Sequence, residues 1–242
     1  MRSIRIFQEG PFELGQNTEL SPEAGQHVGV VLRMQPDEIL TLFCGDNREY
    51  KARITDAHKK RVSIVITAIE SVNRESPRPI HLAQAISKGD RMEWVIQKAV
   101  ELGVTRITPL ITAHCAVRLD DARLAKKQQQ WQAIAVSTCE QCGRNVVPVI
   151  HPTLQFDAFI QHCTSPLKFI LHPTAAMSWQ EISTSEGEVT LLVGPEGGLS
   201  EEEVKRAQSQ QFNALVLGPR ILRTETAAIA ALSVLQAKLG DL

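Results

Sequence analysis

Hydrophobic positions in the first 72 residues recur at the spacing of short β-strands. Apolar runs at Ile39–Cys44 and Val62–Ile69 flank Glu49–Ile54, in which apolar and charged residues alternate. Strict alternation is typical of a strand with one buried and one exposed face. We therefore predict three strands in a small barrel, with one short helix near Ala24–Arg33. In the middle strand the inward residues are Tyr50, Ala52 and Ile54, and the outward residues are Glu49, Lys51 and Arg53.

A polar segment with two prolines, residues 73–79, has the composition of a linker. Beyond it, apolar strands alternate with helical patterns such as Asp90–Leu102, which Gly103 ends. This alternation predicts a mostly parallel sheet with right-handed crossovers. The strands expected are His81–Ile86, Arg106–Thr112, Val146–Ile150, Lys168–Leu171, Thr190–Val193 and Ala214–Leu217, and the longest helices are Asp120–Gln141 and Thr224–Leu239.

The last helix, Thr224–Leu239, is apolar on nearly all sides, with Ser233, Gln236 and Lys238 as its polar interruptions. A helix that is hydrophobic all round is buried. Two interpretations stay open, because such a helix can form a homodimer interface or the centre of one subunit's core.

Composition places the chain among globular proteins. Of its 242 residues 43% are apolar, which is ample for a core. The start of the chain lacks the apolar run of a signal peptide, and no stretch reaches the ~18 apolar residues of a membrane helix. Five scattered cysteines suit reduced thiols. We expect a cytoplasmic protein.

One cysteine pair, Cys139 and Cys142, has the C-x-x-C spacing of redox and zinc sites. A tetrahedral site needs two more ligands, and His114, Cys115 and Cys163 form no second pair at metal-binding spacing. A thioredoxin-type pair opens its helix, whereas this one closes a predicted helix. We expect the two thiols to serve packing and the protein to hold no metal.

Three of the predicted strands end in proline-containing loops: His172-Pro173, Gly194-Pro195 and Gly218-Pro219. Ligands of open α/β sheets bind beyond the carboxyl ends of strands, so these loops form a candidate pocket. Gly-Pro after a strand is also an ordinary turn, and that interpretation stays open.

Charge narrows what this pocket could hold. Ser200 and Glu203 have the spacing of a capping box, and Glu196, Glu201 and Glu202 lie nearby, so a polyphosphate would meet four carboxylates. The loop also matches neither glycine-rich phosphate motif. A neutral or cationic ligand fits better, and a nucleoside that carries a sulfonium is one such ligand. Capping boxes with glutamates are common at ordinary helix starts.

Charge is distributed unevenly along the chain. Residues 74–148 carry 11 basic and 7 acidic side chains, whereas residues 149–242 carry 6 and 10. A polyanion would be drawn to the basic middle, although a mixed soluble surface explains this excess nearly as well.

Four segments together resemble the RsmE family of ribosomal RNA methyltransferases, within the SPOUT superfamily. They read V-G-P-E-G-G-L-S-E-E-E (193–203), L-G-P-R-I-L-R-T-E-T-A-A (217–228), C-E-Q-C-G-R-N (139–145) and I-Q-K-A-V-E-L-G-V-T-R-I-T-P-L (96–110). The resemblance implies a PUA-like, RNA-binding β-barrel over residues 1–72 and a linker over 73–79. It also implies an α/β SPOUT methyltransferase domain with a C-terminal trefoil knot over 80–242, in a homodimer.

The resemblance further implies S-adenosylmethionine as methyl donor and N3 of one uridine in 16S ribosomal RNA, within the small ribosomal subunit, as acceptor. By motif, the cofactor site would comprise Leu171, His172, Pro173, Gly194, Pro195, Glu196, Gly197, Gly198, Leu217, Gly218, Pro219, Ile221, Leu222, Thr224 and Thr226. Candidate contacts to substrate RNA are Arg2, Arg5, Arg33, Lys88 and Arg144, although a solvated surface role fits the first three as well.

Uracil N3 carries a proton at neutral pH, so transfer needs a base or a group that stabilises the anion. Glu225 is the candidate base and Arg223 the candidate stabiliser of the uracil oxygens. The simpler alternative makes Glu225 a first-turn helix carboxylate with Arg223 as its salt-bridge partner.

Two rival functions stay open. A SPOUT ribose 2′-O-methyltransferase acting on tRNA or rRNA would share fold and cofactor, but the Asn of that group's last motif is absent from residues 223–226. A non-catalytic RNA-binding module would need no methyl donor.

Overall fold

The computed structural model describes residues 4–59, 61–117, 119–174, 177–182 and 186–242. Contacts divide the chain into two compact units. The first comprises Met1–Glu75 with Val136–Val147, and the second comprises Ser76–Ala135 with Pro148–Leu242. Arg2, a candidate RNA contact, lies outside the described residues.

The first unit contains a five-stranded sheet in its described part, ordered β1-β3-β4-β5-β2. Strands β1 and β3 run parallel and the other neighbours antiparallel. The three predicted strands are present, and two of them are longer than expected. The bounds are β1 Arg5–Phe7, β2 Asn17–Glu19, β3 Ile39–Phe43, β4 Arg48–His58 and β5 Arg61–Ser71.

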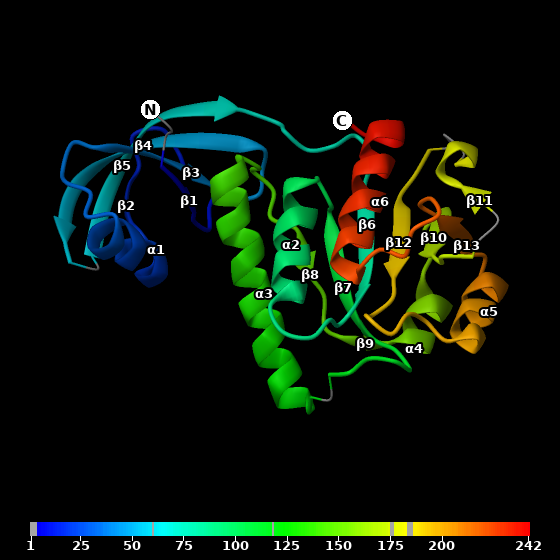
Figure 1. Ribbon diagram of the computed structural model, residues 1–242. Helices are drawn as coiled ribbons and strands as arrows, with labels where there is room; N and C mark the ends of the chain where they lie inside the picture. The colour runs from blue at the N-terminus through cyan, green and yellow to red at the C-terminus, as the bar shows by residue number, and fades with distance from the viewer. Residues whose placement is uncertain (1–3, 60, 118, 175–176, 183–185) are drawn as a thin grey trace. The chain divides into compact units, whose positions relative to one another are not determined.

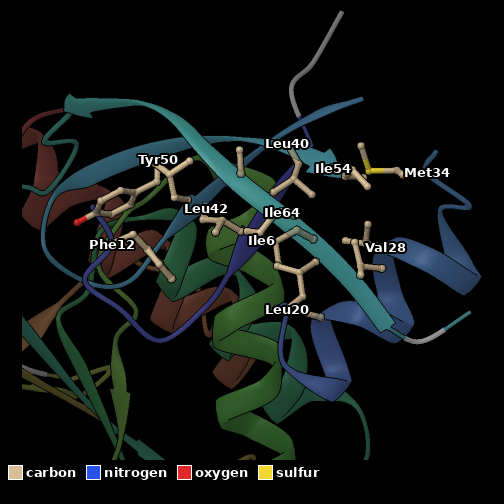
Figure 2. Packing of buried hydrophobic residues seen from close by; sticks show 14 residues of the cluster. Ile6, Phe12, Leu20, Val28, Met34, Leu40, Leu42, Tyr50, Ile54 and Ile64 are labelled. Atoms are coloured by element: carbon tan, nitrogen blue, oxygen red, sulfur yellow. The ribbon is translucent and has the colours of Figure 1, made fainter. Parts of the chain in front are cut away.

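Every second residue of β4 between Tyr50 and Ile54 points into the hydrophobic core of this unit. Tyr50, Ala52 and Ile54 are fully buried, as predicted, and pack with residues of the neighbouring strands (Figure 2). Glu49 was expected to face solvent, and this prediction is wrong, because Glu49 is buried. Its carboxylate pairs with Arg5, Lys51 and Arg74. The predicted helix is present as α1 (Pro22–Gln26), capped by Ser21, and continues as a π-helical turn at His27–Val31.

The second unit contains an eight-stranded sheet among the described residues, with the order β11-β13-β10-β12-β6-β7-β8 and β9 beside β7. All pairs of these strands are parallel, as predicted. The predicted strand over Val146–Ile150 is shorter, at Val149–Ile150. The bounds are β6 Ile80–Ala85, β7 Arg106–Ile111, β8 Val149–Ile150, β9 Leu154–Gln155, β10 Leu167–Leu171, β11 Met177–Ser178, β12 Val189–Val193 and β13 Asn213–Val216.

Helices cover both faces of this sheet, which explains why β6 and β12 are buried along their whole length. Ala83 and Leu192 share a core cluster with residues of α4 and α5, whereas Gln84, the next residue of β6, reaches the start of α6. Helices α2 and α6 pack against each other (Figure 1). The bounds are α2 Arg91–Glu101, α3 Asp121–Cys142, α4 Phe156–His162, α5 Glu201–Ser209, α6 Thr224–Leu239 and the short 3₁₀ helix η2 Trp179–Glu181.

The two open interpretations of the last helix can now be compared for a single subunit. One side of α6 is buried, through Ala228, Ala231, Leu232 and Leu235. The other side, which includes Ala230, Ser233 and Ala237, is half-buried or exposed. Among the described helices, none is long and apolar enough to cross a membrane.

Candidate functional site

A cavity of about 610 Å³ lies beyond the carboxyl ends of β10, β12 and β13. The loops that follow these three strands form its walls, and the first turn of α6 closes it. The structure thus brings together the three proline-containing loops that the sequence singled out. The walls comprise Arg91, Leu171–Pro173, Val193–Leu199, Leu215–Gly218, Arg220–Glu225 and Ala227.

Nearly all of the cofactor-site residues expected by motif line this cavity. The exceptions are Pro219 and Thr226, which lie outside its lining, and Thr226 is exposed. Both candidate catalytic residues, Arg223 and Glu225, are part of the wall. Motif reasoning missed Arg91, because this residue lies outside the four segments that carry the family resemblance.

Thr224 fastens the start of α6 to the ends of two strands. Its hydroxyl donates to the Gly194 carbonyl at 2.6 Å and accepts from the Gln84 amide at 3.1 Å. The Gln84 amide also donates to the Ala85 carbonyl at 3.1 Å, and Gln84 is fully buried. Sequence reasoning missed Gln84, although a polar residue inside an otherwise apolar strand is the signal that could have identified it.

The glycine-rich loop is held close to the loop that follows β7. A Cβ added at Gly197 would lie 3.0 Å from the Cβ of His114, and His114 Nδ1 lies 3.1 Å from the Gly197 carbonyl oxygen. Gly198 has a φ of +70°, which favours glycine. Glycine at position 197 therefore allows the loop to approach His114 closely, and glycine at position 198 allows its turn.

The carboxylates of Glu196 and Glu225 contact the guanidinium of Arg91 at the start of α2. Arg91 Nη1 donates to Glu196 Oε1 at 2.9 Å, and Arg91 Nε lies 3.7 Å from Glu225 Oε1. The Lys88 backbone N–H also donates to Glu196 Oε1, at 2.9 Å. Burial raises the pKa of Glu196, but the hydrogen bonds from Lys88 and Arg91 outweigh it and leave that pKa below its ordinary value.

The two carboxylate oxygens of Glu225 differ, because Oε1 pairs with Arg91 and Oε2 does not. Its Oε2 is buried and has no hydrogen-bond partner within the part of the chain that the structure describes. Unpartnered buried carboxylate oxygens are costly, so they are uncommon outside functional sites. Glu225 thus carries a carboxylate oxygen without a protein donor in a residue that lines the cavity.

The capping box at the start of α5 is confirmed, with Ser200 accepting from the Glu203 N–H at 3.2 Å. Glu203 is buried and also accepts from the Ala113 N–H at 2.8 Å. The expected crowd of four carboxylates around the loop is wrong, because Glu201, Glu202 and Glu203 do not line the cavity. Of those four, Glu196 does, and the second carboxylate in the wall is Glu225.

Comparisons with known proteins agree with this geometry. A family model for an RNA methyltransferase domain matches residues 74–236, and one for an RNA methyltransferase PUA domain matches residues 20–67. The ribosomal RNA small subunit methyltransferase E of Buchnera aphidicola (subsp. Schizaphis graminum) is 37% identical over all of this chain and 98% of its own length. The chain belongs to this methyltransferase family.

Solved structures extend the likeness to the whole fold. A ribosomal RNA small subunit methyltransferase E from Neisseria gonorrhoeae, bound to S-adenosyl methionine, is 38% identical with a TM-score of 0.94, and all of both chains is covered. A Legionella pneumophila structure with bound cofactor SAM is 54% identical with a TM-score of 0.98, again over all of both chains. Family membership confirms the resemblance drawn from the four segments and the mixed α/β fold with a PUA-like domain.

Arg223 and Glu225 are the expected catalytic pair of this methyltransferase, and the structure shows where each of them lies. Arg223 is exposed in the cavity wall, at the N-cap position of α6. The expected alternative, a salt bridge between Arg223 and Glu225, is not among the ion pairs of the described residues, where Arg91 is the partner of Glu225.

The candidate RNA contacts differ in their surroundings. Arg144 is buried against Glu75, and Arg5 Nη2 donates to the Arg144 carbonyl at 3.1 Å and to Asn145 Oδ1 at 2.6 Å. These two arginines hold the segment after α3 against β1 within the first unit, which does not favour contact with a polyanion. Arg33 and Lys88 have exposed side chains.

The cysteine pair closes α3, as predicted. Cys139 is buried and donates to the Val146 carbonyl at 3.7 Å. A hydrogen bond with Cys142, together with burial, raises the pKa of the Cys139 thiol. Within the described residues no group of His, Cys, Asp or Glu has the arrangement of a metal site.

Proposed function

We propose that this protein transfers a methyl group from S-adenosylmethionine to N3 of one uridine in 16S ribosomal RNA, in the small ribosomal subunit. The observation that carries the proposal is a cavity beyond three strand ends whose wall includes both Arg223 and Glu225. Relatives named as small-subunit rRNA methyltransferases, one of them solved with S-adenosyl methionine, support it.

The residues present fit this cofactor. The cavity combines apolar walls at Leu171, Leu217 and Leu222 with the exposed backbone of the glycine-rich loop, which suits an adenine ring and a ribose. Glu196 and Glu225 supply negative charge for a sulfonium, and Arg91, Arg220 and Arg223 in the same wall balance that charge. When bound, the cofactor supplies the methyl group.

The chain's own residues would prepare the acceptor. The Glu225 carboxylate takes the proton of uracil N3, and the resulting anion is the nucleophile. Arg223 stabilises the negative charge that spreads over the two uracil oxygens. The walls hold the acceptor in line with the methyl group, and this positioning contributes much of the rate.

Finer features of the architecture belong to the same proposal. We place the PUA-like β-barrel at residues 1–72, the linker at 73–79 and the SPOUT domain with its C-terminal trefoil knot at 80–242. The active form is a homodimer in the cytoplasm, where its ribosomal substrate is found. Arg33 and Lys88, both exposed, support a role in RNA binding, and Arg2 is proposed on sequence alone.

A ribose 2′-O-methyltransferase acting on tRNA or rRNA is the alternative. Arg223-Thr224-Glu225-Thr226 stands where that group carries its Asn. A ribose hydroxyl and a base nitrogen need different orientations in the cavity, so the position of the new methyl group separates the two functions.

The test uses small subunits from cells that lack this methylation and tritiated cofactor. The expected result is label on one uridine, at N3, with none on subunits that are already methylated. Label on a ribose oxygen would establish the alternative. Calorimetry with S-adenosylhomocysteine adds a second check, because a non-catalytic RNA-binding module would show no binding of that ligand.

A further inference from the structure

Arg91 is the first residue of α2, and its guanidinium contacts two segments of the cavity wall that are far apart in the sequence. It donates to Glu196 in the glycine-rich loop and lies 3.7 Å from Glu225 on α6. We propose that Arg91 is a positioning residue that orients the Glu225 carboxylate toward the acceptor. This inference rests on the proposed function, in which Glu225 is the base.

The two oxygens of the Glu225 carboxylate have different surroundings. Oε1 faces Arg91, whereas Oε2 is buried without a partner among the described residues. The Glu225 side chain is 18% exposed and that of Arg91 39% exposed. Water therefore competes little for Glu225, and the direction of Oε2 depends on how Arg91 holds Oε1.

Glu196 gives Arg91 a second anchor that does not react. Its Oε1 accepts from the Lys88 N–H as well as from Arg91. The Glu196 carboxylate therefore joins the glycine-rich loop to the loop after β6, and the Arg91 guanidinium joins the glycine-rich loop to α6. When Glu225 takes the N3 proton it becomes a neutral acid, and Arg91 stays paired with Glu196. Arg91 thus never becomes an unpaired partly buried charge during turnover.

The charges of Arg91, Glu196, Glu225 and the cofactor sum to zero both before and after the reaction. Before transfer, two carboxylates face the Arg91 guanidinium and a sulfonium. Afterwards the proton lies on Glu225, the methyl group lies on N3 and the sulfonium has become a neutral thioether, so Glu196 and Arg91 remain as a neutral pair. Charge balance before and after the step favours this arrangement in a partly dry cavity.

Other charged groups of the wall do not replace Arg91 in this role. Arg220, Arg223 and His172 line the same cavity, and Lys88 precedes α2. Among the described residues, the ion pairs of Glu196 and Glu225 are both with Arg91. Arg223 is left available for the uracil oxygens.

The experiment measures kcat for methyl transfer to undermethylated small subunits by the full-length protein. The variants are Arg91→Gln, Arg91→Lys, Glu225→Gln and the Arg91→Gln/Glu225→Gln double variant. The matched control is Arg123→Gln, because Arg123 is exposed and pairs with Asp120 on the surface. S-adenosylhomocysteine affinity and the thermal midpoint are measured for each.

We expect Arg91→Gln to lower kcat on the order of tenfold to a hundredfold, as loss of a charge-assisted contact does. Arg91→Lys should recover part of this loss, and S-adenosylhomocysteine affinity should change little. Arg91→Gln should add little loss in the Glu225→Gln background.

Three results would overturn the inference. These are an unchanged kcat in Arg91→Gln, losses that add fully in the double variant, and a loss that follows only from weaker S-adenosylhomocysteine binding or a lower midpoint. If Arg91→Gln does not fold, an unchanged kcat in Arg91→Lys has the same meaning. Failure of the unmodified protein to methylate small subunits would instead remove the proposed function.

Discussion

Glu225 combines three properties that a base for a weakly acidic N–H requires. It faces the cavity, it is only 18% exposed, and one of its oxygens has no partner within the described chain. Glutamine keeps the shape of the side chain but cannot accept the proton.

Glu225→Gln should therefore lower kcat by roughly a hundredfold or more, as loss of a general base does. S-adenosylhomocysteine affinity should stay near that of the unmodified protein. Single-turnover transfer and calorimetry measure the two quantities. Glu201→Gln, an exposed carboxylate in the first turn of α5, is the control. Near-normal turnover in Glu225→Gln would remove it as the base.

His81 is a second residue whose surroundings predict a measurable effect. It lies in β6, buried, with Nε2 2.7 Å from the Thr108 hydroxyl oxygen and with Nδ1 unpartnered among the described atoms. Burial, with repulsion from Arg106 and His151, lowers the pKa of His81 from 6.5 to about 3.

Because the folded-state pKa is depressed, the unfolded chain binds the extra proton between pH 6.5 and about 3. Stability is therefore greatest above pH 6.5 and falls with decreasing pH through that window. His81 should contribute a slope that approaches about 1.4 kcal/mol per pH unit. Urea unfolding at pH 7 and 5 measures it, and His81→Gln should flatten the dependence. The exposed His162→Gln serves as control; an equal flattening there would refute the assignment.

At the scale of elements, Thr224 joins α6 to the ends of β6 and β12. Thr224→Val keeps the shape but leaves the Gln84 amide and the Gly194 carbonyl each without this partner. Loss of stability of about 1–3 kcal/mol is expected, together with weaker S-adenosylhomocysteine binding as the wall loosens. Urea unfolding and calorimetry measure both. Ser209→Ala, which removes an exposed hydroxyl that donates within α5, should change neither.

The strand β4 carries a buried charge that its alternation does not predict. Glu49 pairs with Arg5, Lys51 and Arg74. Burial raises the pKa of Glu49, but Arg74 and Arg5 outweigh it and hold that pKa at about 2. The folded-state pKa is depressed, so its contribution is present above the unfolded value of 4.5 and is lost as pH falls toward 2.

Glu49→Gln should destabilise the protein by about 3 kcal/mol, because Arg5 is left nearly buried with a weaker partner. The comparison is Glu19→Gln, which removes one side of the exposed pair between Glu19 and Arg61 and should have little effect. Denaturant unfolding measures both variants. Equal losses of unfolding free energy in the two variants would show that burial of the Glu49 ion pairs does not contribute to stability.

At the scale of the whole molecule, the outward side of α6 is the feature that one subunit leaves incompletely covered. Small residues such as Ala230 and Ala237 are half-buried or exposed there, on a helix that is otherwise apolar. Helix faces of small residues allow close packing against a second copy.

We therefore expect sedimentation to give about twice the chain mass of 26.8 kDa. Ala230→Glu should shift the protein toward the single-chain mass, because it places a charge on this face. Ala125→Glu, at an exposed position of α3, should leave the mass unchanged. A single-chain mass for the unmodified protein would contradict the dimer.

Much of this molecule could be predicted from local pattern. The bounds of α6, the inward face of β4 and the parallel sheet follow from spacing that acts within a few residues, and the three proline-containing loops follow from the ends of the strands. These features depend on neighbouring residues in the chain, and the sequence alone therefore determined them.

The remaining features needed the tertiary structure. The pairing of Arg91 with Glu225, the burial of Glu49 beside Arg5 and Arg74, and the inclusion of Val136–Val147 in the first unit join residues that are far apart in the sequence. A charged side chain looks the same in sequence whether it faces water or a distant partner of opposite charge. Only the folded chain decides between these environments, because burial and pairing depend on which segments the topology brings together.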